Sequence, residues 1–136
     1  MIKVVLDTNI YVSAIVFGGK PREVFLEITR GKRALFVSKK ILAELRGVLR
    51  KKFKYTLLEI DRVEQIILEI AEIIEPRQTI TIIPSQPMDN HILECAVETK
   101  ADFVITGDKK HLLLLKKFKN IPIISADQFL KIFQSM

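Results

Sequence analysis

Residues 2–6, Ile-Lys-Val-Val-Leu, form a short and mostly apolar run that is followed directly by Asp7. The same arrangement returns at residues 103–106, where Phe-Val-Ile-Thr precedes Gly107-Asp108. Short apolar runs that end at a turn are typical of strands buried on both faces of a parallel sheet. Because parallel strands end at one edge of their sheet, we expect both aspartates at that edge.

The rest of the chain alternates between short strands and helices. Further strands are expected at residues 34–37 and 122–124, and the β-branched segment 79–83 fits either a strand or an extended edge before a loop bracketed by Pro84 and Pro87. Helices are expected over 10–17, 21–31, from Ser38 through Leu49, from the Thr56-x-x-Glu59 capping box to about Glu75, from Asp89 through Val97, over 111–118, and from Ser125 onward. This alternation predicts one α/β domain over residues 1–136, a parallel sheet flanked by helices on both faces.

Length and composition narrow the class of protein. The 136 residues suit one domain, and 49% hydrophobic with 28% charged residues excludes intrinsic disorder. Cys95 is the single cysteine, so an internal disulfide or a cysteine-based zinc site is excluded. The sequence starts directly in a strand pattern, and its longest apolar runs are too short to cross a bilayer. We therefore expect a cytoplasmic protein without a membrane segment.

The net charge leaves two interpretations open. Lysine and arginine number 22 against 16 acidic residues, which gives a formal charge of +6. Such an excess fits ordinary solubility, and it fits equally a polyanionic partner. The positions of the acidic residues are more informative than their number.

Four acidic residues form the candidate site. Asp7, Asp89 and Asp108 each precede or open a helix, where a single carboxylate often serves as a cap. Together they would repel one another at one sheet edge unless a cation neutralised them. Glu44 sits in mid-helix at the border of the apolar stripe, where it needs a partner or a metal, unless it reaches water or pairs with Arg46 or a lysine.

Hard oxygen donors favour a hard cation. Carboxylates without a cysteine or histidine cluster suit Mg²⁺ or Mn²⁺ rather than zinc. His91 and His111 lie far apart in the sequence, and we expect surface or capping roles for both. Glu94 is a further acid that could lie near the site. A centre of this kind can activate water and stabilise displacement at phosphorus.

These motifs together resemble a PIN-domain ribonuclease. The resemblance rests on Leu6-Asp7-Thr8-Asn9, Glu44 in mid-helix, Asp89-x-x-Ile92-x-x-x-Ala96 and Thr106-Gly107-Asp108 before a helix, and it covers essentially the whole chain. It implies metal-dependent cleavage of single-stranded RNA, with Asp7, Glu44, Asp89 and Asp108 as catalytic metal ligands. Asn9 and Thr106 match the polar residues that support the carboxylates.

The resemblance also suggests a biological setting. Many stand-alone PIN domains are toxins of type II toxin–antitoxin pairs that a small antitoxin protein silences, and family members commonly form homodimers. The size of this chain resembles that group. An RNA-processing nuclease and a non-catalytic RNA- or protein-binding scaffold remain alternatives. A haloacid dehalogenase-like phosphotransferase is disfavoured, because Asn9 stands where it needs a second aspartate.

Two basic runs are candidate RNA contacts. One accompanies and follows the helix that carries Glu44, and the other follows Asp108: Arg46, Arg50, Lys51, Lys52 and Lys54, then Lys109, Lys110, Lys116, Lys117 and Lys119. Either run could instead be a solvated surface. Phe53 and Tyr55 lie among the first run, where we expect a packing role. With few free aromatic rings, weak sequence preference is predicted.

Overall fold

The structure is a computed structural model, and it describes residues 1–31, 33–81 and 87–134. Its strands are β1 (Lys3–Leu6), β2 (Ala34–Ser38), β3 (Ala71–Ile74), β4 (Phe103–Ile105), β5 (Lys117–Phe118) and β6 (Ile121–Ile124). Its helices are α1 (Thr8–Val16), α2 (Gly19–Arg30), α3 (Lys39–Lys51), α4 (Leu57–Ile70), α5 (Pro87–Thr99), α6 (Leu112–Leu115) and α7 (Ala126–Gln134).

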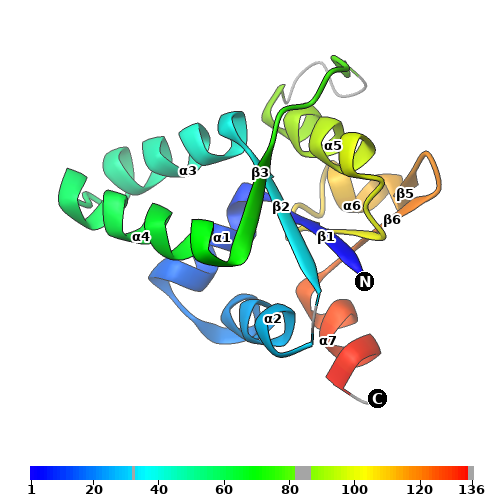
Figure 1. Ribbon diagram of the computed structural model, residues 1–136, viewed down its shortest axis with the longest axis horizontal. Coiled ribbons are helices and arrows are strands. Elements are labelled where there is room, and N and C mark those ends of the chain that lie inside the picture. Colours follow the sequence, from blue (N-terminus) through cyan, green and yellow to red (C-terminus); the bar gives the residue numbers. More distant parts are fainter. Residues whose placement is uncertain (32, 82–86, 135–136) are drawn as a thin grey trace.

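The strands form one sheet in the order β3-β2-β1-β4-β6-β5 (Figure 1). Strand β1 lies at its centre and pairs in parallel with β2 and β4, with Leu6 opposite Ile105. Strand β5 pairs antiparallel with β6 at the edge. The predicted α/β architecture is therefore confirmed, although the sheet is mixed rather than wholly parallel.

Helices cover both faces of the sheet. Helices α2 and α7 pack together on one side, and α5 packs on β1, β2 and β4 on the other (Figure 1). Helix α3 packs on α1, α4 and α5 through a buried apolar stripe of Ile41, Leu42, Leu45 and Leu49. The central strand β1 is buried from Val4 to Leu6, as its apolar sequence requires. No helix among the described residues has the length and apolar composition needed to span a membrane.

Three predicted helix starts, at Ser38, Thr56 and Ser125, are confirmed by their capping contacts, whereas α1, α2 and α5 begin two residues before the expected positions. The Ser38 hydroxyl accepts a hydrogen bond from the Ile41 N–H at 3.3 Å. Thr56 and Glu59 form a complete capping box at the start of α4. The Gln128 N–H donates to the Ser125 hydroxyl at 3.1 Å, while the Gln128 side chain accepts from the Ser125 N–H at 2.8 Å. Each cap satisfies backbone donors that a helix start leaves unpaired.

The predicted helix from Thr56 to about Glu75 was wrong at its carboxyl end. Helix α4 stops at Ile70, and residues 71–74 form strand β3, which pairs in parallel with β2. The apolar pattern continues across this boundary without a glycine or proline. Hydrogen bonding to β2 therefore ends the helix, and Pro76 follows the strand.

Two further boundaries differ from the prediction. The helix expected over 111–118 is only the single turn α6, because Lys116 adopts a positive φ of 60° and the chain then enters β5. Residues 79–81 form no strand, and the remainder of the segment expected at 79–83 lies outside the described residues. The loop expected from Pro84 to Pro87 also falls largely outside them.

Candidate metal centre

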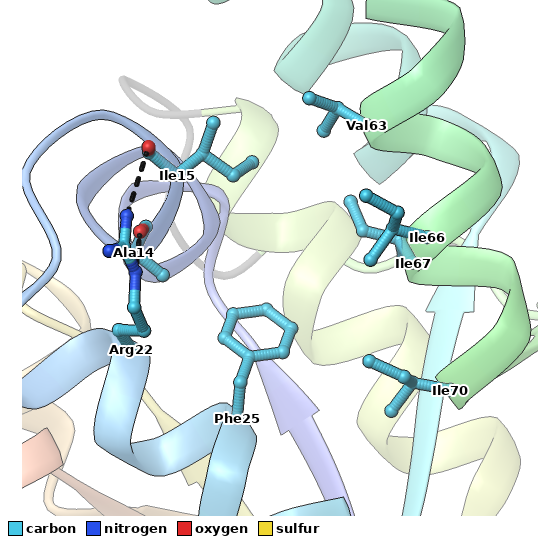
Figure 2. A pocket seen from close by; sticks show the side chains of 8 residues that line it. All are labelled: Ala14, Ile15, Arg22, Phe25, Val63, Ile66, Ile67 and Ile70. Carbon is cyan, nitrogen blue, oxygen red and sulfur yellow. Dashed lines mark hydrogen bonds between the residues drawn. The ribbon is translucent and has the colours of Figure 1, made fainter.

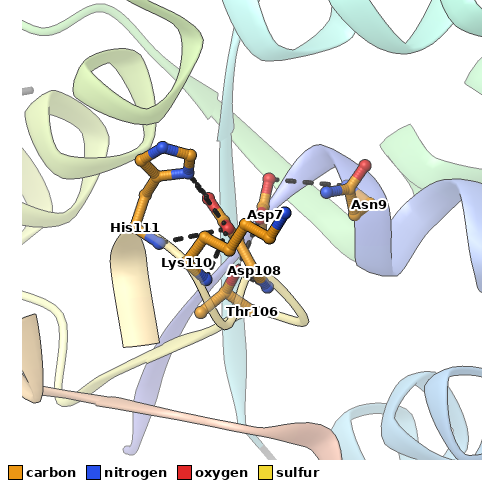
Figure 3. Close-up of polar contacts among 6 residues, drawn as sticks. All are labelled: Asp7, Asn9, Thr106, Asp108, Lys110 and His111. Atoms are coloured by element: carbon orange, nitrogen blue, oxygen red, sulfur yellow. Dashed lines mark hydrogen bonds and ion pairs between the residues drawn. The ribbon is translucent and has the colours of Figure 1, made fainter. Parts of the chain in front are cut away.

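The pairing register of β1 and β4 brings Asp7 to Thr106. Leu6 lies opposite Ile105, so the residues that follow these two strands are neighbours. The Asp7 N–H donates to the Ile105 carbonyl at 2.9 Å, and the Thr106 hydroxyl donates to Asp7 Oδ2 at 2.6 Å (Figure 3). Both side chains are buried. A hydroxyl donor of this kind orients a carboxylate and fixes which lone pairs stay available.

Asp108 is held at the start of the turn that leads into α6. Its N–H donates to the Thr106 hydroxyl at 3.0 Å. Its Oδ1 accepts from the Lys110 and His111 N–H groups, each at 3.2 Å (Figure 3). Nδ1 of His111 lies 3.2 Å from both carboxylate oxygens. Thr106 therefore links the two aspartates that follow neighbouring strands.

Glu44 reaches the same edge from α3. Ser38 caps this helix at the end of β2, and Glu44 lies on its second turn. Glu44 Oε2 accepts a hydrogen bond from the Thr8 hydroxyl at 2.8 Å. Arg46, which we considered as a partner for Glu44, instead contacts Asp61 at 2.9 Å and Glu64 at 3.0 Å. Glu44 thus faces the edge of the sheet where Asp7 and Asp108 lie, rather than a neighbouring cation. We call this edge, with its four acids, the acidic edge.

Asp89 joins the other acids from the start of α5. It lies in the first turn of α5 and is only 8% exposed, and its Oδ2 has no hydrogen-bond partner within the described residues. Burial, the neighbouring Asp108 carboxyl and the charges of Asp7, Asp108 and Glu44 raise the pKa of Asp89 to about 7. The four predicted acids therefore lie within electrostatic reach of one another.

The other three carboxyls respond to the same crowding. Burial raises the pKa of Asp7 despite the Thr106 hydrogen bond, and the Asp108 charge adds to the rise. Burial and the Asp7 charge also raise the pKa of Glu44, against the hydrogen bond from Thr8. Burial alone would raise the pKa of Asp108, but hydrogen bonds from Asp89, His111 and Lys110 hold it below its ordinary value. Such a cluster attracts a cation.

The donor set fits a divalent cation. One ligand atom each of Asp89, Asp108 and His111 lies within 4.8 Å of the others. The buried Asp89 Oδ2, which has no partner in the part of the chain that the structure describes, supplies a free oxygen donor. Carboxylate oxygens suit Mg²⁺ and Mn²⁺, and a bound cation would relieve the repulsion that raises the pKa of Asp89.

Sequence reasoning missed two residues of this edge. Thr8 lies inside the quoted Leu6–Asn9 motif, yet its contact with Glu44 depends on how α1 and α3 pack. His111 was expected to have a surface or capping role, but its ring contacts Asp108. The Asp108-x-x-His111 spacing could have indicated this, because residues three apart meet across a turn.

Asn9 and Glu94 differ from the four acids in exposure or in their hydrogen-bond partners. Asn9 is exposed, and its main-chain N–H contacts Asp7 at 3.4 Å. Glu94 is buried, accepts from the Ile80 N–H at 2.8 Å and has an oxygen 3.0 Å from His91 Nδ1. These contacts connect Glu94 to the segment before α5 and to His91 on α5, whose charge also acts on Glu44.

The candidate RNA-binding cations fall into distinct groups. Lys109 and Lys110 are exposed directly beside Asp108, whereas Arg46 is engaged by two acids. The exposed Arg50, Lys51 and Lys52 lie at the carboxyl end of α3. Phe53 and Tyr55 pack against the core, in agreement with the packing role we expected.

A separate apolar groove lies between α1, α2 and α4, away from the acids (Figure 2). Its volume is about 270 Å³, and it is lined by Ala14, Ile15, Arg22, Phe25, Val63, Ile66, Ile67 and Ile70. Ile66 is 58% exposed, and Arg22 donates to the Ala14 and Ile15 carbonyls from one side. The groove is thus an open apolar surface with a cation on its rim.

The fold and the acidic edge define a class of protein. The family model described as a PIN domain matches residues 3–110, which include all four acids. The chain belongs to the PIN-domain family.

Two solved structures resemble the chain over nearly its whole length. One is VapBC2 from Rickettsia felis bound to a DNA fragment from its promoter, with a TM-score of 0.65 and 23% identity over 91% of this chain and 98% of that one. The other is DNA-bound VapBC from Salmonella typhimurium, with a TM-score of 0.65 and 20% identity over 93% and 99%. At these identities the likeness shows the shared fold. Among curated proteins, none matches this sequence.

Proposed function

We propose that this PIN domain is a Mg²⁺- or Mn²⁺-dependent endoribonuclease that cleaves single-stranded RNA. Asp7, Glu44, Asp89 and Asp108 would be its catalytic, metal-holding residues. One observation carries the proposal: these four acids converge, and Asp89 keeps a buried oxygen without a partner among the described residues and a pKa of about 7. A binding scaffold gains nothing from negative charge gathered where phosphates would approach.

The acids, threonines and lysines at this edge would have different roles. Asp7 and Asp108 would hold the ion from the strand ends, Asp89 from the start of α5, and Glu44 from α3. A divalent ion bound there supplies polarisation of a phosphoryl oxygen and activation of water. Thr106 and Thr8 fix the orientation of Asp7 and Glu44 through their hydroxyl groups. Lys109 and Lys110 carry positive charge to the rim, where an RNA backbone would need it.

We further propose that the nuclease is the toxin of a toxin–antitoxin pair. Support comes from the almost complete coverage of the two matching chains, both from VapBC structures. A silencing partner needs a surface to cover, and the apolar groove between α1, α2 and α4 offers one. Arg22 on its rim and the net charge of +6 favour an acidic partner segment. A homodimer stays a prediction.

The decisive experiment is RNA cleavage with and without divalent metal. Purified protein is incubated with a mixed pool of single-stranded RNA in Mg²⁺ or Mn²⁺, with a chelator as the negative arm, and the cut ends are sequenced. We expect metal-dependent internal cuts without a sharp multi-base consensus, and loss of cutting in Asp7→Asn and Asp108→Asn. Glu69→Gln, which changes an exposed carboxylate on α4, is the matched control and should cut normally.

The outcomes separate the candidate functions. RNA binding that survives the chelator, without cuts under any condition, would favour the scaffold. Cuts confined to one processed transcript would favour an RNA-processing nuclease. For the partner, Ile66→Asp should leave cleavage intact while abolishing inhibition by the antitoxin protein proposed here. Unchanged inhibition would exclude the groove as the contact surface.

A further inference from the structure

His111 differs from the other residues around the acids because it offers nitrogen. Its Nδ1 lies 3.2 Å from both oxygens of Asp108 (Figure 3). One of its ring nitrogens also falls within 4.8 Å of ligand atoms of Asp89 and Asp108. The side chain of His111 is 32% exposed and that of Asp108 is 16% exposed. An ion from solvent can therefore reach both.

A second observation points to a ligand at the same place. Asp89 is more than nine-tenths buried, and its Oδ2 finds no hydrogen-bond partner in the described chain. A buried carboxylate oxygen without a partner is costly. The simplest way to satisfy it is a cation held between Asp89, Asp108 and His111.

Orientation of Asp108 does not require the imidazole. The main-chain N–H groups of Lys110 and His111 already donate to Oδ1, and the Asp108 N–H is anchored on the Thr106 hydroxyl. The ring therefore adds a donor to a carboxylate that the backbone has already positioned. A nitrogen ligand at this position would change which cations the centre prefers, rather than how Asp108 is oriented.

We propose that His111 is a nitrogen ligand of the metal centre and that the centre therefore prefers Mn²⁺ and other first-row transition ions to Mg²⁺. This inference rests on the metal site of the proposed function. Mg²⁺ binds oxygen almost exclusively and keeps much of its water, whereas imidazole is a good ligand for first-row transition ions. Loss of the imidazole ring should therefore weaken the binding of Mn²⁺ and other first-row transition ions more than the binding of Mg²⁺.

The test measures metal binding directly, without RNA. Mn²⁺ binding is followed by the electron paramagnetic resonance signal of free Mn²⁺, Mg²⁺ by calorimetry, and Co²⁺ by its visible absorption. His111→Ala should weaken Mn²⁺ binding by about 10–100-fold, the range for lost metal-site contacts, and leave Mg²⁺ binding nearly unchanged. The Co²⁺ spectrum should shift as a nitrogen ligand is replaced by water. Glu69→Gln, at an exposed carboxylate on α4, is the control and should leave the binding of all three ions unchanged.

A second variant separates ligation from positioning. The side-chain amide of His111→Asn can still donate to Asp108 but offers no imidazole nitrogen. If His111 is a metal ligand, the Mn²⁺ affinity of His111→Asn should remain as low as that of His111→Ala. Recovery of Mn²⁺ binding would overturn the proposal. Equal weakening of Mg²⁺ and Mn²⁺ by His111→Ala would also overturn it. Tight Mn²⁺ binding by the wild type without RNA cleavage would refute the nuclease while leaving the role of His111 standing.

Discussion

The Thr106 hydroxyl donates to Asp7 Oδ2 at 2.6 Å across 99 positions of sequence. The contact exists because Leu6 and Ile105 are opposite one another on paired parallel strands. Since the Thr106 hydroxyl also accepts from the Asp108 N–H, one hydroxyl links the Asp7 carboxylate to the main chain of Asp108. The ends of β1 and β4 thus position Asp7 and Asp108, whereas Glu44 and Asp89 reach the same edge from helices α3 and α5.

Removing this hydroxyl should weaken the metal centre. Thr106→Val keeps the side-chain shape but leaves Asp7 without its short hydrogen bond. We expect metal affinity or RNA cleavage to fall by about 10–100-fold, as for other residues that orient metal ligands. Metal titration and cleavage rates measure this. Thr29→Val, at an exposed threonine whose hydroxyl donates to the Leu26 carbonyl, should change neither.

Asp89→Asn should stabilise the metal-free protein at high pH. The raised pKa of Asp89 means that folding favours its protonated form, so the stabilising contribution is complete below about pH 4 and is lost as pH rises to about 7. The whole rise in pKa from 3.8 to about 7 corresponds to about 4 kcal/mol at 1.36 kcal/mol for each tenfold change in proton affinity. Because solvent screens part of the repulsion, neutralising the group should raise the free energy of unfolding at pH 8 by on the order of 2 kcal/mol. Urea unfolding in chelator at pH 8 and pH 4 measures it, and no gain is expected at pH 4.

A matched aspartate should show the opposite sign. Hydrogen bonds from Lys20 and Lys131 lower the pKa of the partly exposed Asp127. Asp127→Asn should therefore slightly destabilise the protein at pH 8, and the loss should fade as pH falls through the lowered pKa. A stabilising effect of equal size in both variants would show that net charge, not the acidic edge, causes it.

Divalent ions should stabilise the protein most above neutral pH. A ligand that binds only the folded state raises stability, and protons compete for the same carboxylates. Because the pKa of Asp89 is about 7, we expect Mn²⁺ to raise the melting temperature clearly at pH 8 and much less at pH 5.5. Thermal unfolding with and without Mn²⁺ tests this. A rise at pH 5.5 that matches the one at pH 8 would contradict it.

Lys109 and Lys110 should contribute to RNA affinity through charge. Replacing both with glutamine should reduce the salt slope of log affinity for single-stranded RNA by about one to two. Arg46→Gln is the control, since Arg46 is held by Asp61 and Glu64. It should leave the slope unchanged and cost at most about 1 kcal/mol of stability. Fluorescence anisotropy over a salt series, in chelator to prevent cleavage, provides the measurement.

Local sequence alone determined most of the elements and indicated the four acids as candidate site residues. The apolar run before Asp7, the caps at Ser38, Thr56 and Ser125, and the mid-helix position of Glu44 are all set by residues within a few positions. Hydrophobic periodicity and capping act over this range, so they can be read from one chain.

Only the tertiary structure decided where α4 ends, that β5 runs antiparallel, and how the acids meet. The Ala71–Ile74 segment becomes a strand because β2 offers it hydrogen bonds, and its own residues do not forbid a longer helix. Thr8 reaches Glu44, and Thr106 reaches Asp7, through packing and register between distant segments. Charge crowding and burial that raise the pKa of Asp89 likewise arise only when four elements converge, because electrostatic interactions depend on distance in space rather than along the chain.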